Sequence, residues 1–368
     1  MDLQEKRLFV AMELSNKKWM LGFGNGSAER FRTITARDQK TLKFEVKRAK
    51  EKLGLPPDCK VVCCYEAGRD GFWIDRMLKQ NGYENFVMDP ASIEVPRRAR
   101  KKKTDRLDVK KLLKILLRRE LWGELDAFSV VCIPSKGQEA ETRIHRERGR
   151  LVKERTGHRG RMKSLLALHG ILVGNPARAV IADLKDWDGK KLPSSMIAEL
   201  IREQERLRQV EAQIKLIEQQ QAAGLADPQT QGHEKAVKLK GLKSVGLQTS
   251  WILSHECFAW RKFANRKKVG SFVGLTGTPH SSGDLNRELG ISKAGSARLR
   301  ALLIELAWGW VRWQPESALT KWYIDKYVRT GNKRGKKVGI VALARKLLVA
   351  LWKYIEFDIV PEGAIIEA

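Results

Sequence analysis

Four carboxylates lie at positions where they could bind a metal ion. Glu13 follows the apolar run LFVAM and Glu66 follows the apolar run VVCCY, so each is expected at the end of a buried strand. Asp105 and Asp108 lie three residues apart in KKKTDRLDVKK, which places both on one side of a helix. An acid at a strand end can point into the crevice where open α/β sheets bind ligands. The four acids could therefore bind two Mg²⁺ ions and position a water or hydroxyl group for attack on a phosphodiester.

Each acid also has a structural explanation. Acids are favoured in the first turn of a helix as caps or as partners of the helix dipole, which would account for Asp105 and Asp108 without a metal. An acid at the end of a strand can equally point to solvent. The spacing alone leaves both interpretations open.

A pair of serines in TPHSSGDLNRE could supply a nucleophile. Ser281 and Ser282 are expected in a flexible loop between an apolar segment and a helix, and Gly283 would let the backbone approach a phosphate closely. A serine hydroxyl needs a base or a metal to become a strong nucleophile, and His280 and Asp284 are near without forming a recognisable catalytic set. Either serine could instead be a turn or cap residue.

Hydrophobic periodicity predicts the elements that position the four acids. Short apolar runs predict strands at residues 6–15, 18–24, 30–36, 60–68 and 84–90. Apolar spacings of three and four predict helices at residues 41–54, 71–82 and 105–121. This order is typical of an α/β domain with a five-stranded sheet flanked by helices, and we place it at residues 1–130.

Two further regions are predicted to be mainly helical. Residues 131–230 have the long, charged and amphipathic pattern of an antiparallel helical hairpin or coiled coil, although an ordinary helical spacer fits as well. Residues 231–368 form a third, mostly α-helical domain. Within it, GLKSVG places Gly241 and Gly246 in a helix-hairpin-helix-like turn whose backbone amides could meet a phosphate.

The charge of the chain indicates a polyanionic partner. It has 71 Lys and Arg against 43 Asp and Glu, a formal net charge of +28. Dense basic runs repel themselves unless phosphates neutralise them, which favours a nucleic acid over a solvated helix face. The residues expected to contact nucleic acid are Arg97, Arg98, Arg100, Lys101, Lys102, Lys103, Arg106, Lys110, Arg146, Arg150, Arg155, Arg159, Gly241, Gly246, Arg287, Arg298 and Arg300.

The sequence indicates a reducing compartment and no membrane segment. Its five cysteines form no CxxC pair and lie mostly in apolar runs, so neither a disulfide framework nor a zinc site is predicted from them. The first residues lack the pattern of a signal peptide, and charge interrupts the most apolar stretches. We expect a cytoplasmic protein.

Taken together, these motifs resemble a known family. An acid on the first strand, a Glu in a YEA segment after the fourth and the DRLDVKKL helix are similar to the RuvC-like nuclease domain of DEDD transposases. GLKSVG, FVGLTGTPHSSGD and GISKAGSARLRALLIELAW resemble the serine-bearing C-terminal domain of the same insertion-sequence recombinases, which are relatives of the pilin-gene invertases. The resemblance covers nearly the whole chain. Two departures are Glu13, where the family usually has Asp, and Lys240, where a Pro is common.

The resemblance implies a mechanism and partners. It implies an RNase H/RuvC-like N-terminal fold in which Glu13, Glu66, Asp105 and Asp108 bind Mg²⁺, with Ser282 as the nucleophile that forms a covalent phosphoserine link to DNA. It further implies a structured noncoding bridge RNA that selects donor and target double-stranded DNA. A homo-tetramer is expected on the DNA, with each composite site built from two protomers, in a bacterial or archaeal cytoplasm and associated with the nucleoid. Arg287, Arg298 and Arg300 would be phosphate clamps.

Two other functions remain compatible with the residues. One is a structure-specific, Holliday-junction-type endonuclease in which metal-activated water replaces the serine as the nucleophile. The other is a non-enzymatic RNA- or DNA-binding protein in which the acids are structural.

Overall fold

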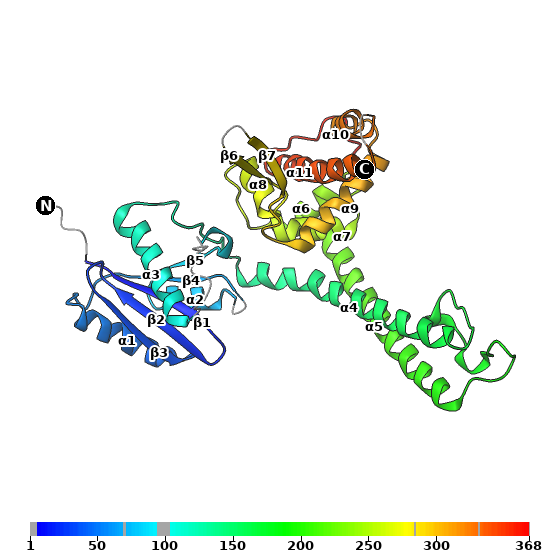
Figure 1. Cartoon of the computed structure of the whole chain (residues 1–368), viewed down its shortest axis with the longest axis horizontal. Helices are drawn as coiled ribbons and strands as arrows, with labels where there is room; N and C mark the ends of the chain where they lie inside the picture. Colours follow the sequence, from blue (N-terminus) through cyan, green and yellow to red (C-terminus); the bar gives the residue numbers. More distant parts are fainter. Residues whose placement is uncertain (1–5, 69–70, 94–103, 283–284, 330–331, 368) are drawn as a thin grey trace. The chain divides into compact units, whose positions relative to one another are not determined.

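The computed structural model describes residues 6–68, 71–93, 104–282, 285–329 and 332–367. The chain divides into two units, residues 1–133 and residues 134–368 (Figure 1). No helix in these described ranges is long and apolar enough to cross a membrane.

The first unit is an α/β domain with a mixed five-stranded sheet. Its strands, in the order β3-β2-β1-β4-β5, are β1 (Leu8–Leu14), β2 (Lys18–Gly24), β3 (Glu29–Thr35), β4 (Val61–Glu66) and β5 (Glu84–Met88). β1 is central and pairs antiparallel with β2 and parallel with β4. β2–β3 is antiparallel and β4–β5 is parallel, so the sheet is mixed, and all five predicted strands are confirmed.

Helices cover both faces of this sheet. The first face packs against α1 (Gln39–Lys52) and α2 (Trp73–Gln80) through Leu8, Val10 and Met12 of β1. The opposite face packs against α3 (Asp105–Trp122) through Phe9 and Ala11 of the same strand. The alternation of side chains along a strand thus divides the core into two layers.

The second unit begins with a long helical hairpin. α4 (Lys136–Ala167) and α5 (Ser194–Ala226) pack against each other through apolar residues that include Leu151, Val210 and Ile214 (Figure 1). Ser135 and Gln138 form a capping box that fixes the start of α4. The segment between the two helices adds a small core of its own around Ile181 and Leu192.

The rest of the second unit is mostly helical around one core. Its elements are α6 (Gln231–Lys240), α7 (Leu247–Leu253), the π-helical turn η4 (Ser254–Phe258), α8 (Arg266–Phe272), α9 (Ala297–Trp313), α10 (Ala318–Tyr323), the π-helical turn η5 (Ile324–Val328) and α11 (Lys333–Phe357). The apolar residues of α9 and α11 fill this core, as their sequences predict.

The main difference from the sequence-based expectation lies around the serines. Residues 277–291, expected as a loop that leads into a helix, form an antiparallel hairpin of β6 (Gly277–Ser282) and β7 (Leu285–Ile291). The next helix, α9, begins only at Ala297. Ser282 is therefore the last residue of β6 and pairs with Leu285, the first residue of β7.

Candidate functional site

Two of the predicted acids share one edge and one face of the N-terminal sheet. The parallel register pairs Met12 of β1 with Tyr65 of β4, so Glu13 and Glu66 follow at the same level, at the carboxyl ends of neighbouring strands. Phe9 and Ala11 face α3, and so do Val62 and Cys64. Since side chains alternate along a strand, Glu13 and Glu66 lie on that same α3 face.

The helix α3 brings the other two acids to this edge. Its residue Val109 lies against Gly22, which pairs with Ala11 of β1, and Leu113 lies one turn later against Gly24, which pairs with Phe9. The helix therefore runs opposite to β1. Asp105 and Asp108 precede Val109 and extend toward the carboxyl end of β1, where Glu13 lies.

The start of α3 is capped by a residue other than these acids. The hydroxyl of Thr104 accepts a hydrogen bond from the backbone N–H of Leu107 at 3.4 Å. Asp105 is exposed and Asp108 is half-buried. A capping role for either acid is therefore unnecessary, although both complement the helix dipole. We conclude that the fold brings all four acids to one edge of the sheet.

The backbone around the predicted nucleophile belongs to the β6–β7 hairpin. Ser282 pairs with Leu285, Ser281 with Asn286 and His280 with Arg287. Ser282 is thus the last paired residue of β6, whereas Gly283 and Asp284 lie outside the described residues.

The basic residues expected to bind nucleic acid divide into several groups. The first cluster, at residues 97–103, lies outside the described ranges. Arg106 lies over the ring of Phe31 at 5.2 Å, and Lys110 is 3.5 Å from a carboxylate oxygen of Glu29. Arg150 is exposed and Arg155 is half-buried on α4.

Several other arginines of this set make contacts within the protein. Arg146 donates two hydrogen bonds to Glu256, at 2.8 and 2.9 Å. Arg298 donates to the carbonyl of His145 at 2.7 Å, and Arg300 donates to the carbonyl of Val273 at 3.0 Å. The structure therefore gives these arginines a packing role whether or not they also contact nucleic acid.

A second glutamate–arginine contact involves Arg159, which pairs with Glu211 across the α4–α5 hairpin. Arg287 lies on β7, in the same hairpin as the serines.

The contacts of Glu256 set its charge state. Burial by itself would raise the pKa of Glu256, but hydrogen bonds from His145 and Arg146 outweigh this and lower that pKa to about 2. Burial lowers the pKa of His145, so its ring is neutral and Nε2–H donates to Glu256 at 2.9 Å. Glu256 is thus an ionised anchor that joins α4 to η4.

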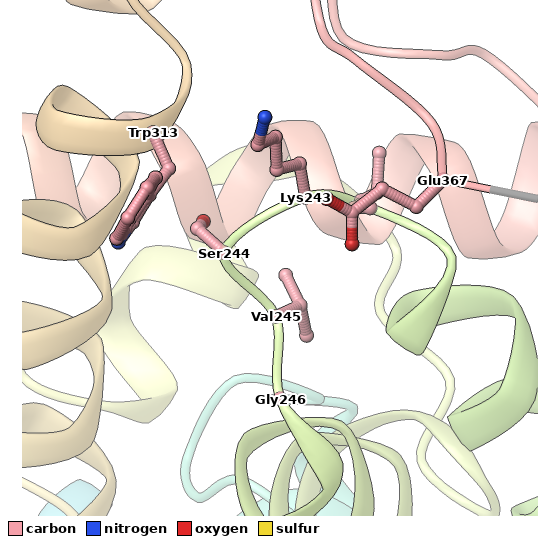
Figure 2. Close-up of a pocket in the computed structure, with 7 residues that line it drawn as sticks. Lys243, Ser244, Val245, Gly246, Trp313 and Glu367 are labelled. Atoms are coloured by element: carbon pink, nitrogen blue, oxygen red, sulfur yellow. The ribbon is translucent and has the colours of Figure 1, made fainter.

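The turn between α6 and α7 lines a hollow of about 400 Å³ (Figure 2). Its walls are Leu242, Lys243, Ser244, Val245, Gly246, Trp313 and Glu367. Ser244 adopts a left-handed conformation with φ 80°. The C-terminal segment covers one side of the turn: the N–H of Lys243 donates to Ile365, and the N–H of Glu367 donates to Gly241. Gly241 therefore contacts this tail, whereas Gly246 faces the hollow.

Sequence comparison places the chain among known transposases. Residues 236–321 match the domain family described as Transposase IS116/IS110/IS902 family. Transposase y4rJ of Sinorhizobium fredii is 37% identical over 98% of this chain and 94% of its own length. This chain belongs to the IS116/IS110/IS902 family of transposases.

Two further transposases match shorter parts of the chain. A family 20 transposase of Pseudomonas aeruginosa is 29% identical over 60% of this chain and 65% of its own length. The transposase for insertion sequence element IS1328 of Yersinia enterocolitica is 26% identical over 59% of this chain and 63% of its own length. The predicted resemblance to insertion-sequence transposases is confirmed at the level of the family.

Sequence reasoning missed one group of side chains in this transposase. Glu141 on α4, His233 on α6 and His255 on η4 bring one ligand atom each within 4.8 Å of one another. They are separated by 92 and 22 residues and fit no short metal-binding motif, so only the fold brings them together.

Proposed function

We propose that this transposase is a Mg²⁺-dependent, RNA-guided DNA recombinase that excises and inserts its own insertion sequence. The observation that carries the proposal is the placement of Glu13, Glu66, Asp105 and Asp108 at one edge of one domain. The mixed sheet, with β1 central between an antiparallel and a parallel neighbour, supports the RuvC-like assignment of this domain.

The donor set suits a magnesium ion. All four side chains are carboxylates, and hard oxygen ligands are those that Mg²⁺ prefers. Asp105 is exposed and Asp108 half-buried, so water can complete the coordination shell that Mg²⁺ retains in most protein sites. When bound, the ion would neutralise charge on the transferred phosphate.

Ser282 is the proposed nucleophile. Its Oγ would attack a phosphorus atom of the DNA backbone, lose its proton and displace a deoxyribose oxygen, which leaves as a hydroxyl group after it gains a proton. The phosphate exchanges one ester bond to a sugar oxygen for one ester bond to the serine oxygen, so the number of bonds is conserved. A second DNA hydroxyl can later attack the same phosphorus and release the serine. The position of Ser282 at the end of β6, where it pairs with the first residue of β7, supports this role because the end of a two-stranded hairpin can approach a DNA backbone closely.

The net charge of +28 supports nucleic-acid partners. We include the bridge RNA, donor and target DNA and a tetrameric assembly in the proposal. The exposed Arg150 and the half-buried Arg155 on α4 are the described basic residues that we expect to contact phosphate most directly.

The RNA guide is tested by purification. The protein would be expressed with its flanking DNA, purified in high salt, and the retained RNA sequenced. A single discrete species from the adjacent noncoding flank is the expected result, whereas a random mixture of cellular RNA would overturn guided recognition.

The nucleophile is tested with a matched pair of variants. Ser282→Ala should abolish both DNA cleavage and the covalent protein–DNA adduct on a denaturing gel, whereas Ser281→Ala should retain both. Cleavage that persists in Ser282→Ala would refute the assignment. Cleavage by the wild-type protein without any adduct would instead favour a junction endonuclease that uses metal-activated water.

A further inference from the structure

We propose that Glu141, His233 and His255 bind a Zn²⁺ ion in the second unit, separate from the four carboxylates of the first. The three side chains come from α4, α6 and η4, and their ligand atoms all lie within 4.8 Å of one another. Two imidazoles and one carboxylate form a donor set that zinc uses in proteins. A donor set with two imidazole nitrogens suits Zn²⁺ better than Mg²⁺, which prefers oxygen ligands.

The strongest observation is the environment of His255. Its side chain is 1% exposed, and Nε2 has no hydrogen-bond partner among the residues that the structure describes. The other ring nitrogen, Nδ1, lies 2.8 Å from the carbonyl oxygen of Trp251, so it carries the proton and donates. Nε2 is then a buried lone pair, and such a group is costly unless it meets a proton donor or a metal.

A carboxylate lies close to this lone pair. Nε2 of His255 lies 3.5 Å from Oε2 of Glu141, and because the ring proton is on Nδ1, two electron-rich atoms face each other with no proton between them. Ligand atoms around a tetrahedral zinc at 2.0–2.1 Å are about 3.3 Å apart. The observed separation therefore matches two neighbouring corners of a zinc tetrahedron.

The backbone of α6 leaves room for these atoms. A Cβ atom on Gly232 would lie 2.7 Å from Nε2 of His255 and 3.2 Å from Oε2 of Glu141, so any larger residue would crowd both ligands. The next residue, His233, then places its ring 5.7 Å from that of His255, centroid to centroid. Gly232 thus allows the third ligand to join the other two.

Surrounding groups hold His255 in the orientation that a ligand needs. Its ring stacks on Trp251 with centroids 4.4 Å apart, and Ser254 Oγ lies 2.8 Å from Nδ1. A ligating histidine commonly donates its second N–H to a backbone carbonyl in this way, which fixes the tautomer and raises the basicity of the ligand nitrogen. Three protein ligands leave a fourth position for water.

The ion would link two parts of the second unit. α4 is one half of the α4–α5 hairpin, whereas α6 and η4 belong to the helical core that α9 and α11 fill. A metal bound to all three elements would fix the base of the hairpin to that core. Metal binding would then add to the stability of the second unit, because the unfolded chain lacks a preformed site.

The test uses the full chain in magnesium-free buffer. We expect the purified protein to contain one zinc per chain by elemental analysis, and Co²⁺ added to the zinc-free protein to give the visible absorption of a tetrahedral site. We expect Glu141→Gln and His233→Gln to weaken Co²⁺ binding by more than about 100-fold. His169→Gln, in the connection after α4, is the matched control and should bind like the wild type.

Two outcomes would overturn the proposal. The first is that the wild-type protein binds no more Co²⁺ than the Glu141→Gln variant does. The second is that neither zinc nor a chelator changes the melting temperature. The melting temperature is measured on the wild-type chain with zinc and with chelator, so this second outcome does not depend on a variant that might not fold. It is also independent of DNA cleavage, so failure of the proposed recombinase reaction would leave this result interpretable.

Discussion

Gly22 and Val109 lie so close that a Cβ atom on the glycine would be 2.4 Å from Cγ1 of the valine. This contact between β2 and α3 fixes the position of the helix along the strands of the sheet. Because Asp105 and Asp108 lie just before Val109, the contact also sets the position of two of the four acids relative to Glu13.

We therefore expect Gly22→Ala to impair the site as well as the fold. The added methyl group must push α3 away from the sheet, and overpacking of this kind costs about 1–3 kcal/mol of unfolding free energy. DNA cleavage should fall by more than the loss of folded protein explains. Thermal unfolding and cleavage would be measured together.

Gly160→Ala on α4 is the matched control, since a Cβ atom there meets nothing within 4 Å. It should leave activity unchanged and raise stability slightly through helix propensity. Equal melting temperatures for wild type and Gly22→Ala would show that the sheet and helix are less tightly packed than the structure indicates.

The variants Asp105→Asn and Asp108→Asn should abolish cleavage without unfolding the domain. Thr104 caps the helix, so loss of either negative charge removes only a dipole interaction worth about 0.3–1 kcal/mol. Mg²⁺-dependent cleavage and melting temperature are the two measurements. Asp126→Asn, an exposed acid after the other end of α3, is the control and should remain active. A large drop in melting temperature in both variants would instead indicate a structural role.

Arg146→Ala should lower stability more than it lowers nucleic-acid affinity. The guanidinium donates two hydrogen bonds to Glu256, and their loss leaves a partly buried carboxylate with fewer donors, which costs about 1–3 kcal/mol. Chemical denaturation and the salt dependence of RNA binding would separate the two effects. Arg150→Ala, on the exposed surface of the same helix, should show the reverse: an unchanged denaturation midpoint and a salt slope smaller by about 1.

Glu203 should make the α4–α5 hairpin sensitive to acid. Burial raises the pKa of Glu203, but hydrogen bonds from His158, Arg161 and Arg206 outweigh it, so the folded pKa lies below the ordinary value of 4.5. A depressed carboxyl pKa stabilises the fold above the unfolded pKa, and this stability is lost as the pH falls through the folded pKa.

Glu203→Gln should accordingly lower the melting temperature at pH 7 and flatten the loss of stability below about pH 4.5. The exposed Glu205→Gln should retain the wild-type pH profile. The melting temperatures of the three proteins would be measured as a function of pH. Identical profiles for the wild type and Glu203→Gln would contradict a depressed pKa of Glu203 in the folded protein.

The N-terminal fold was predictable because its signals are local. Alternation in LFVAMEL and KWMLGFG marks strands within a few residues, and the periodicity of DRLDVKKLLKILL marks α3. Placement of the acids at strand ends and in a first helical turn followed from the same signals.

The remaining features depend on distant contacts. The β6–β7 hairpin contains Pro279 and several polar residues, a composition that favours loops, and only cross-strand pairing such as His280 with Arg287 makes it a sheet. Likewise, the partner of Arg146 lies 110 residues away at Glu256, and the histidines near Glu141 follow no spacing rule. Charge patterns in the sequence therefore could not separate arginines that pack from those that face solvent.

The tail that covers the α6–α7 turn also bears on how the second unit folds. Leu242 bridges to Ile366, about 120 residues later, whereas contacts within α6 and α7 are local. Closing so long a loop carries an entropic cost that must be met before the contact forms. The C-terminal tail should consequently pack onto the turn late in folding, after the α4–α5 hairpin has formed. Hydrogen-exchange protection of the Lys243 amide should therefore appear in a slower kinetic phase than protection along α5.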